Sequence, residues 1–127
     1  MKTALQVALA LVAIRVIEVR PDGTVWKLQD LRTGANLRRP RRMETLGKKG
    51  YLLVKVCLNG NQYVLGAHQL VWTALRGRIP RGLEPNHEDG DKTNNHPDNL
   101  TLMTRGENIA HAYRTGLRGT RSIQVAA

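Results

Sequence analysis

Alternating apolar and polar positions predict a β-hairpin near the start of the chain. Residues 15–19 alternate and are rich in β-branched side chains, and a second run of the same kind covers residues 24–28. Between these runs, Pro21-Asp22-Gly23 has the residue types of a tight turn. Before the hairpin, the apolar run from Ala4 to Ile14 predicts a helix or a strand with one apolar face.

A second hairpin and a helix are predicted in the middle of the chain. Two strand-like runs, residues 51–58 and 62–65, flank Asn59-Gly60-Asn61. Asn and Gly both tolerate the positive φ that a type I′ turn requires. Residues 67–76 then have apolar side chains at helical spacing, and a glycine follows them. We interpret His68, near the start of this helix, as a core or supporting histidine rather than a catalytic one.

The segment between the two hairpins, residues 29–49, has little periodicity. It contains four arginines around Pro40, which cannot be buried without partners. We therefore predict that residues 37–42 form a loop or an arm. Arg offers phosphate a forked, bidentate donor, so a flexible run of four is suited to contacts with a nucleic-acid backbone. A loop that only increases solubility is the other interpretation.

Residues 83–103 predict two short strands joined by a polar loop. The first strand, residues 83–87, ends at a histidine and leads into a loop rich in Asp, Asn and Gly. Residues 100–103 form the returning strand.

A capping box then fixes the start of the last helix. Thr104 is the predicted N-cap, and Glu107 lies three residues further on. Asn108 and His111 are three residues apart and therefore lie on one face of this helix.

The length and the charge distribution limit the class of protein. A chain of 127 residues has the size of one ordinary domain. The formal net charge of +10 is unevenly spread, because residues 31–60 contain eight Lys or Arg and one acid, whereas residues 84–98 contain five acids. A basic body around a locally acidic patch is typical of a polyanion-binding protein with a cation site. A solvated basic face is the alternative.

Cysteine usage and the first residues indicate the compartment. Cys57 is the only cysteine, which excludes a disulfide framework and a cysteine-built zinc site and agrees with a reducing compartment. The early apolar run is shorter than the roughly 20 residues that a bilayer requires, and no clean cleavage site follows it. We therefore expect no membrane association, and a monomer, since no sustained heptad is present.

The second half of the chain contains the ingredients of phosphodiester hydrolysis. That reaction needs a base to deprotonate water and a cation to neutralise charge on the phosphate. Histidine is a suitable base because its ordinary pKa is about 6.5. Oxygen donors from Asn, Asp or phosphate suit Mg²⁺. A purely structural histidine beside an Asp-Gly turn is equally compatible with this spacing.

Several short motifs follow one another in a defined order along the second half of the chain. They are Ala67-His68-Gln69-Leu70-Val71, Asn86-His87-Glu88-Asp89-Gly90, Asn94-Asn95, Asn99-Leu100 and Glu107-Asn108. Residues 66–116, which contain them, resemble an HNH nuclease domain of the phage and intron homing-endonuclease type. The upstream strands with Gly50-Tyr51 resemble the leader that often precedes this domain.

The resemblance implies an α+β fold with three parts. A ββα-metal (His-Me finger) nuclease core covers residues 66–116. Residues 1–65 precede it as β-hairpins, a helix and a basic loop expected to contact DNA, and residues 117–127 follow as a basic tail. A cytoplasmic location, in a bacterium or a phage-infected host cell, is the corresponding expectation.

The resemblance also assigns roles to four residues. His87 is implied to be the general base, and Asn99 to support the loop and keep the imidazole oriented. Asn108, 21 positions after His87, is implied to ligate a metal ion through its side-chain oxygen. Asn86 stands beside the base, where relatives often have an Asp as the other ligand.

The presence of Asn at position 86, where relatives often have Asp, affects the binding of the implied cofactor, a divalent ion such as Mg²⁺ or Mn²⁺. Two neutral amides would bind such an ion poorly, so phosphate oxygens must supply most of the charge, and we expect weak metal binding until DNA is bound. Asp89 is the nearest anionic candidate, with turn capping as its alternative role. His111 is an additional candidate as a ligand or phosphate donor, with a solvent-facing histidine as the alternative.

The implied function is a metal-dependent endonuclease, of homing type and phage origin, that hydrolyses double-stranded DNA by nicking or cutting both strands. The ends would be 5′-phosphate and 3′-hydroxyl. Basic side chains expected to hold the DNA backbone are Arg38, Arg39, Arg41, Arg42, Lys48, Lys49, Arg114, Arg118 and Arg121. The alternatives are a DNA-binding module that has lost cleavage, and a basic RNA-binding or packaging protein.

Overall fold

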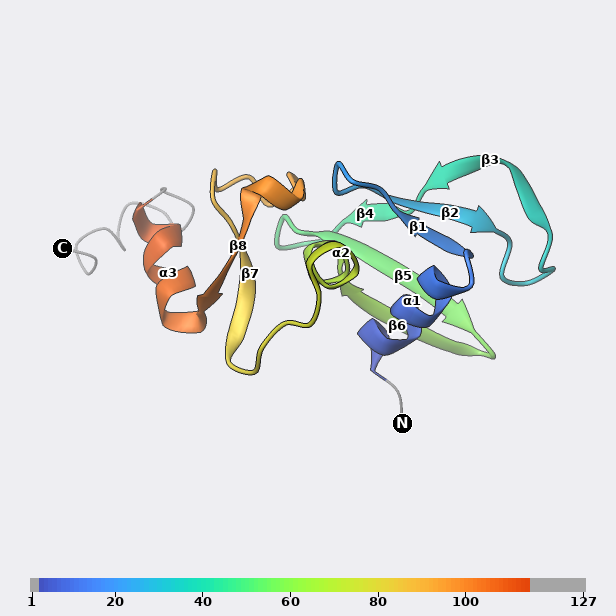
Figure 1. Cartoon of the computed structure of the whole chain (residues 1–127), viewed down its shortest axis with the longest axis horizontal. Helices are drawn as coiled ribbons and strands as arrows, with labels where there is room; N and C mark the ends of the chain where they lie inside the picture. Colours follow the sequence, from blue (N-terminus) through green and yellow to red (C-terminus); the bar gives the residue numbers. More distant parts are fainter. Residues whose placement is uncertain (1–2, 115–127) are drawn as a thin grey trace.

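The computed structural model describes residues 3–114, and within them the chain forms three α-helices, eight strands and one short 3₁₀ helix. The strands form two three-stranded sheets, β1-β2-β3 and β4-β5-β6, and a separate two-stranded sheet, β7-β8. Figure 1 shows β1, β2 and β3 at one end of the molecule and β7, β8 and α3 at the other, with α2 between them. The arginine-rich strand β3 is therefore at the opposite end from α3, and the motif residues of α2 lie between these ends.

The apolar run near the start forms a helix, α1 (Ala4–Ala13). Thr3 and Gln6 form a capping box, in which the Thr3 hydroxyl accepts from the Gln6 amide and the Gln6 side chain accepts from the Thr3 amide. One face of α1 is buried. Among residues 3–114, no helix has the length and apolar character needed to span a membrane.

The first predicted hairpin is confirmed as β1 (Ile17–Val19) and β2 (Val25–Gln29), which pair antiparallel. A third strand, β3 (Asn36–Arg42), pairs with the other side of β2. Residues 37–42 were expected to form a loop or an arm, and that prediction was wrong.

Strand β3 is possible because it lies at the edge of its sheet. An edge strand needs one hydrogen-bonded neighbour only, and it tolerates proline and exposed charges that a central strand would not. Most of its side chains are exposed, so neither face has an apolar period that could reveal a strand. Its pairing with β2 also shifts register between Lys27 and Gln29, which further weakens any regular pattern.

The second predicted hairpin is confirmed as β5 (Leu52–Leu58) and β6 (Asn61–Gly66). Asn59 and Gly60 both have positive φ, 52° and 79°, as the type I′ turn requires. A short strand that the sequence did not indicate, β4 (Glu44–Leu46), pairs with the other side of β5.

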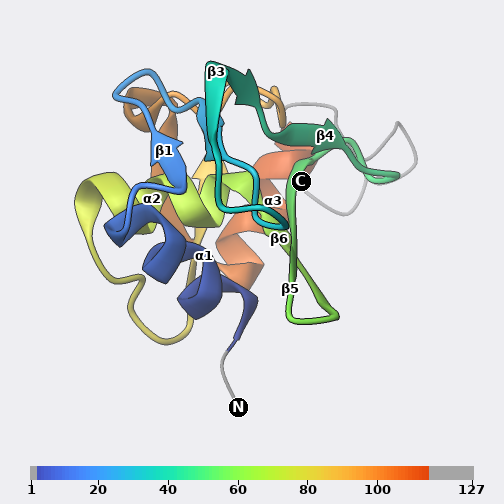
Figure 2. The same cartoon turned by 90° about the vertical axis from the view of Figure 1, so that its right-hand side faces the viewer.

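The core is aliphatic and combines both larger sheets with two helices. Helix α2 (Ala67–Arg76) has the predicted bounds and packs against α1 (Figure 2). The largest fully buried side chains come from β1, β2, β5 and α2, and they are Ile17, Val25, Val54, Val56, Leu70 and Val71. These residues fix α2, and with it His68, against the sheets.

The last part of the described chain is a hairpin followed by a helix, as predicted. Strand β7 (Leu83–His87) pairs antiparallel with β8 (Leu100–Thr104), and the loop between them contains the 3₁₀ helix η1 (Pro97–Asn99). Helix α3 (Arg105–Arg114) contacts both strands. The predicted tail, residues 117–127, lies outside the described residues.

Candidate active site

His87 ends strand β7 and is buried, with 5% of its surface exposed. Its ring Nε2 lies 2.7 Å from the side-chain oxygen of Asn95. Because an amide oxygen can only accept a hydrogen bond, a neutral His87 carries its proton on Nε2 and has its lone pair on Nδ1. The contact therefore fixes both the orientation and the tautomer of the ring.

Two further rings pack on His87. The centroid of Tyr51 lies 5.9 Å from that of His87, the centroid of His68 lies 5.3 Å away, and Tyr51 and His68 are 5.3 Å apart. His68 comes from the first turn of α2, so its interpretation as a supporting histidine agrees with this packing. Burial, followed by the nearby charge of His87, lowers the pKa of His68 to about 4.

The environment also keeps His87 neutral. Burial lowers its pKa below the ordinary 6.5, while the hydrogen bond that the ring donates to Asn95 and the charges of Asp89 and Asp91 act in the opposite direction. Lys92 lowers the pKa slightly further. A neutral imidazole at pH 7 is the form that can accept a proton.

Asn99 and Asp89 hold the loop between β7 and β8 together. The Asn99 amide donates to Asp89 Oδ1 at 2.9 Å and to the backbone oxygen of Asn94 at 2.9 Å, and it accepts from the Asp89 backbone N–H at 3.1 Å. Asn94 donates to the other Asp89 oxygen at 2.9 Å. Hydrogen bonds from Asn94, the Asp91 backbone and Asn99 lower the pKa of Asp89. Both Asp89 oxygens are engaged in the loop, which favours the capping role over metal ligation.

Asn95 is the residue that the sequence reasoning missed. Asn99 was expected both to support the loop and to orient the imidazole, but the ring contact comes from Asn95. Asn95 is buried at 4% exposure, and its Nδ2 has no partner among the described residues. The Asn94-Asn95 pair in the motif was a signal for an amide here, although it does not distinguish which amide faces the ring.

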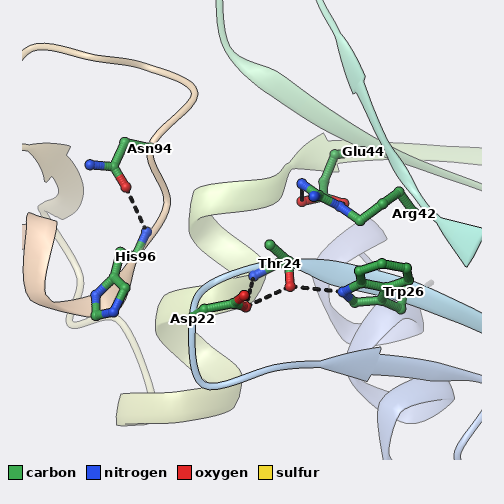
Figure 3. Close-up of polar contacts among 7 residues, drawn as sticks. All are labelled: Asp22, Thr24, Trp26, Arg42, Glu44, Asn94 and His96. Atoms are coloured by element: carbon green, nitrogen blue, oxygen red, sulfur yellow. Dashed lines mark hydrogen bonds and ion pairs between the residues drawn. The ribbon is translucent and has the colours of Figure 1, made fainter.

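The turn of the first hairpin contacts the same loop. Gly23 is buried with φ +85°, and a Cβ there would lie 2.0 Å from the backbone oxygen of Asn95. Figure 3 shows the turn at Asp22 and Thr24 beside the segment of Asn94 and His96. The N-terminal sheet therefore packs on the residue that holds His87.

Helix α3 brings a second set of side chains to β7. The predicted capping box is present, since Thr104 and Glu107 exchange two backbone-to-side-chain hydrogen bonds of 3.2 Å each. One residue further, the Asn108 amide nitrogen donates to the carboxylate of Glu84. Asn86 is buried, and its Nδ2 lies 3.5 Å from the His87 backbone oxygen.

His111 is buried rather than solvent-facing. Its Nε2 lies 3.1 Å from the backbone oxygen of Glu88, just beyond the end of β7. With Asn108 beside Glu84 and His111 beside Glu88, α3 runs along β7 on the side where Asn86 stands between those two positions. His87 follows Asn86 directly as the last residue of β7, and among residues 3–114 no hydrogen bond joins the His87 ring to the side chain of Asn86 or Asn108.

The donor set suits a hard divalent cation. Within residues 3–114 no group of three or more His, Cys, Asp and Glu side chains is arranged to hold a metal ion. The oxygens of Asn86 and Asn108, with Glu84 adjacent, are the donors that Mg²⁺ or Mn²⁺ accepts when substrate phosphate completes the coordination. The residues present therefore fit the implied ion.

The basic residues divide into two groups. Arg38, Arg39 and Arg41 are exposed on β3. Lys48 and Lys49 are exposed between β4 and β5, where the Lys49 backbone oxygen accepts from Lys92 of the β7–β8 loop at 2.9 Å. This contact places the lysines beside the loop that follows His87.

Arg42 differs from the other β3 arginines because it is engaged within the protein. It forms two 2.8 Å hydrogen bonds with Glu44 and lies over the Trp26 ring, as Figure 3 shows. Arg114 is exposed in the last turn of α3. Arg118 and Arg121 lie outside the described residues.

Comparisons with known proteins agree with this geometry. The model of the HNH endonuclease family matches residues 65–110. The SPbeta prophage-derived protein YosQ of Bacillus subtilis (strain 168), described as an HNH homing endonuclease, is 46% identical over 50 residues. That alignment covers 39% of this chain and 29% of the relative.

The fold is also shared with a solved structure. The HNH homing endonuclease I-HmuI matches with a TM-score of 0.60 and 24% identity, over 85% of this chain and 57% of that chain. This chain thus spans less than a third of the curated relative and little more than half of the I-HmuI chain. Because the structural match covers 85% of this chain, it extends beyond residues 65–110. Residues 65–110 of this chain are therefore similar in sequence to the HNH endonuclease family, and the fold around them is similar to that of an HNH homing endonuclease.

Proposed function

We propose that this protein is a metal-dependent endonuclease that hydrolyses phosphodiester bonds in double-stranded DNA. The observation that carries the proposal is the state of His87 inside the HNH domain. The ring is buried, held at Nε2 by Asn95, and depressed in pKa, so that Nδ1 is an unprotonated base at neutral pH. The structure of I-HmuI concerns DNA binding and cleavage by that enzyme, which supports DNA as the substrate here.

In the proposed reaction His87 Nδ1 takes a proton from the attacking water. The Nε2–H bond to Asn95 stabilises the imidazolium that results, because an amide oxygen favours the charged form. Tyr51 and His68 pack against the His87 ring, and the neutral state of His68 avoids repulsion between two imidazolium groups. Asn99 and Asp89 keep the loop in place without contacting the ring.

Asn86 and Asn108 are the residues proposed to hold the divalent ion, Mg²⁺ or Mn²⁺. When bound, such an ion would supply positive charge that offsets the negative charge of the phosphate group during hydrolysis. The hydrogen bond from Asn108 Nδ2 to Glu84 leaves the Asn108 side-chain oxygen available as a donor to the ion.

The proposed DNA contacts are made by the basic side chains of β3, of the turn before β5 and of the end of α3. The exposed arginines of β3 can contact several successive phosphates, and Lys48 and Lys49 are near the β7–β8 loop. We propose a monomer in the bacterial or infected-cell cytoplasm, in agreement with a single unpaired cysteine.

A plasmid-relaxation assay with Mg²⁺ or Mn²⁺ tests the proposal. The wild-type protein should convert supercoiled plasmid to nicked or linear DNA, and His87→Ala should lower the rate by roughly 10²- to 10⁴-fold. Binding of His87→Ala to duplex, measured by fluorescence anisotropy, should be unchanged.

His96→Ala is the matched control, because His96 is an exposed histidine of the same loop with local contacts to Asp98. It should cleave at the wild-type rate. Intact plasmid with either ion would refute the proposed activity, and full activity in His87→Ala would remove His87 from the role of base.

A further inference from the structure

The two amides proposed as metal ligands carry no charge, although a divalent cation is most stable next to anionic oxygen. Of the carboxylates along β7, the following loop and α3, most are engaged in structural bonds. Asp89 ties the loop, Glu88 accepts from Thr101 at 2.6 Å, and Glu107 caps the helix. Asp91 accepts from Thr93.

Glu84 is different because its hydrogen-bond partner is the amide of Asn108. It precedes Asn86 by two positions on β7, so both side chains extend from the same face of the strand. The face carrying Glu84 and Asn86 is therefore the one along which α3 runs. One partly buried carboxylate thus lies next to both proposed ligands.

The direction of the hydrogen bond also matters. A carboxylate can only accept, so it must face the Asn108 nitrogen, and the amide oxygen is then turned away from Glu84. Without this partner the amide could present either its nitrogen or its oxygen to a cation, and the nitrogen would be repelled. Outer partners of this kind orient metal ligands and tune their affinity.

We propose that Glu84 is the positioning residue for Asn108 and supplies the negative charge that the two amide ligands lack. This inference rests on the proposed function of the site as a cation-dependent nuclease centre. It accounts for divalent-ion binding by a site with Asn at position 86, since an anionic group lies two residues upstream on the same strand face and acts through Asn108.

The test measures Mn²⁺ binding directly, without reference to cleavage. Free Mn²⁺ is followed by its electron paramagnetic resonance signal during titration of the protein bound to a short random-sequence duplex, with the duplex alone as the blank. Glu84→Gln keeps an acceptor oxygen but removes the charge, and it should weaken Mn²⁺ binding roughly 10- to 100-fold. Glu84→Ala removes both and should weaken it at least as much.

Glu107→Gln is the matched control. It makes the same charge change one residue before Asn108, and Gln at this position still completes a capping box. Its Mn²⁺ affinity should equal that of the wild type. Duplex affinity and thermal unfolding of all three variants should also be close to the wild type, which excludes misfolding as the cause.

Two outcomes would overturn the inference. One is an unchanged Mn²⁺ affinity in Glu84→Gln, and the other is an equal loss in Glu107→Gln, which would indicate a general charge effect. A cleavage assay run in parallel separates this result from the proposed function. If the wild type cleaves while Glu84→Gln binds Mn²⁺ normally, the nuclease assignment stands and only the role of Glu84 fails.

Discussion

At the scale of single residues, the candidate site contains two histidines in contact, His87, which is buried, and His68, which is partly buried, and the pKa of each is lowered. His87 must be unprotonated to act as a base, and burial is the main cause of its lowered pKa. His68 packs against His87, and the pKa of His68 is lowered to about 4. Protonation of His87 should affect the cleavage rate, whereas protonation of His68 should affect the folding stability.

The pH dependence of cleavage reports on His87. Because its pKa is below the ordinary 6.5, the base remains active as the pH falls to 6.5 and is lost only below that value. Single-turnover rates measured between neutral and mildly acidic pH, at saturating Mn²⁺, should therefore decline with a midpoint below 6.5. A midpoint above 6.5 would contradict the environment described for His87.

The pH dependence of stability reports on His68. In the unfolded chain His68 is protonated below about 6.5, whereas in the folded protein protonation occurs only near pH 4. Folding stability is therefore complete above pH 6.5 and is lost as the pH falls toward 4, by at most about 3 kcal/mol from this group. Urea unfolding across this range should show a smaller loss in His68→Gln than in the wild type. Equal slopes would show that His68 is not the titrating group.

The sequence was sufficient to assign most, but not all, residues of the candidate site to their elements. His87, Asn99 and Asn108 could be placed because motif order and strand-helix patterns fix their elements. The ring partner Asn95 could not, since the choice among nearby amides depends on the path of the loop through η1 and on packing against Gly23. Glu84 was also missed, because a hydrogen bond between β7 and α3 has no local pattern.

At the scale of elements, the sequence was most informative where local chemistry determines structure. The Asn59-Gly60 turn and the capping box of α3 were both predicted and confirmed. It was least informative for β3 and β4, whose strand character comes from pairing with β2 and β5 rather than from their own composition.

The capping box at the start of α3, the helix that carries Asn108, should contribute measurably to the stability of the protein. Thr104→Ala removes the hydroxyl that accepts from the Glu107 amide and should destabilise the protein by about 1 kcal/mol. Thr104→Ser retains the hydroxyl and should be close to the wild type. Urea denaturation measures both, and equal stability of the two variants would mean that the cap contributes nothing.

At the scale of the whole molecule, the exposed arginines of β3 and the β7-β8-α3 unit lie at opposite ends (Figure 1). A duplex that contacts both ends must extend along the long axis of the protein. Salt dependence of binding then measures how many phosphates the β3 end contacts.

Replacement of Arg38, Arg39 and Arg41 together by Ala should lower the slope of log affinity against log salt by about 3, since each phosphate contact contributes roughly 0.9. Fluorescence anisotropy with duplex at several salt concentrations gives the slope. Arg76→Ala is the control, because Arg76, the last residue of α2, forms an ion pair with Asp98 of η1 and is outside the proposed surface. An unchanged slope in the triple variant would exclude β3 from the DNA interface.

The contact between Gly23 and the backbone of Asn95 limits how the candidate nuclease site could be transferred to another protein. The family match begins at residue 65, yet the ring of His87 is braced by Tyr51 and its amide partner is backed by the first hairpin. A graft of residues 65–110 alone onto another DNA-binding scaffold would transfer the base without these supports. The shortest segment that keeps these supports therefore starts upstream of Gly23. A side chain at position 23 would collide with the backbone of Asn95 and would thereby disturb the contact between Asn95 and His87.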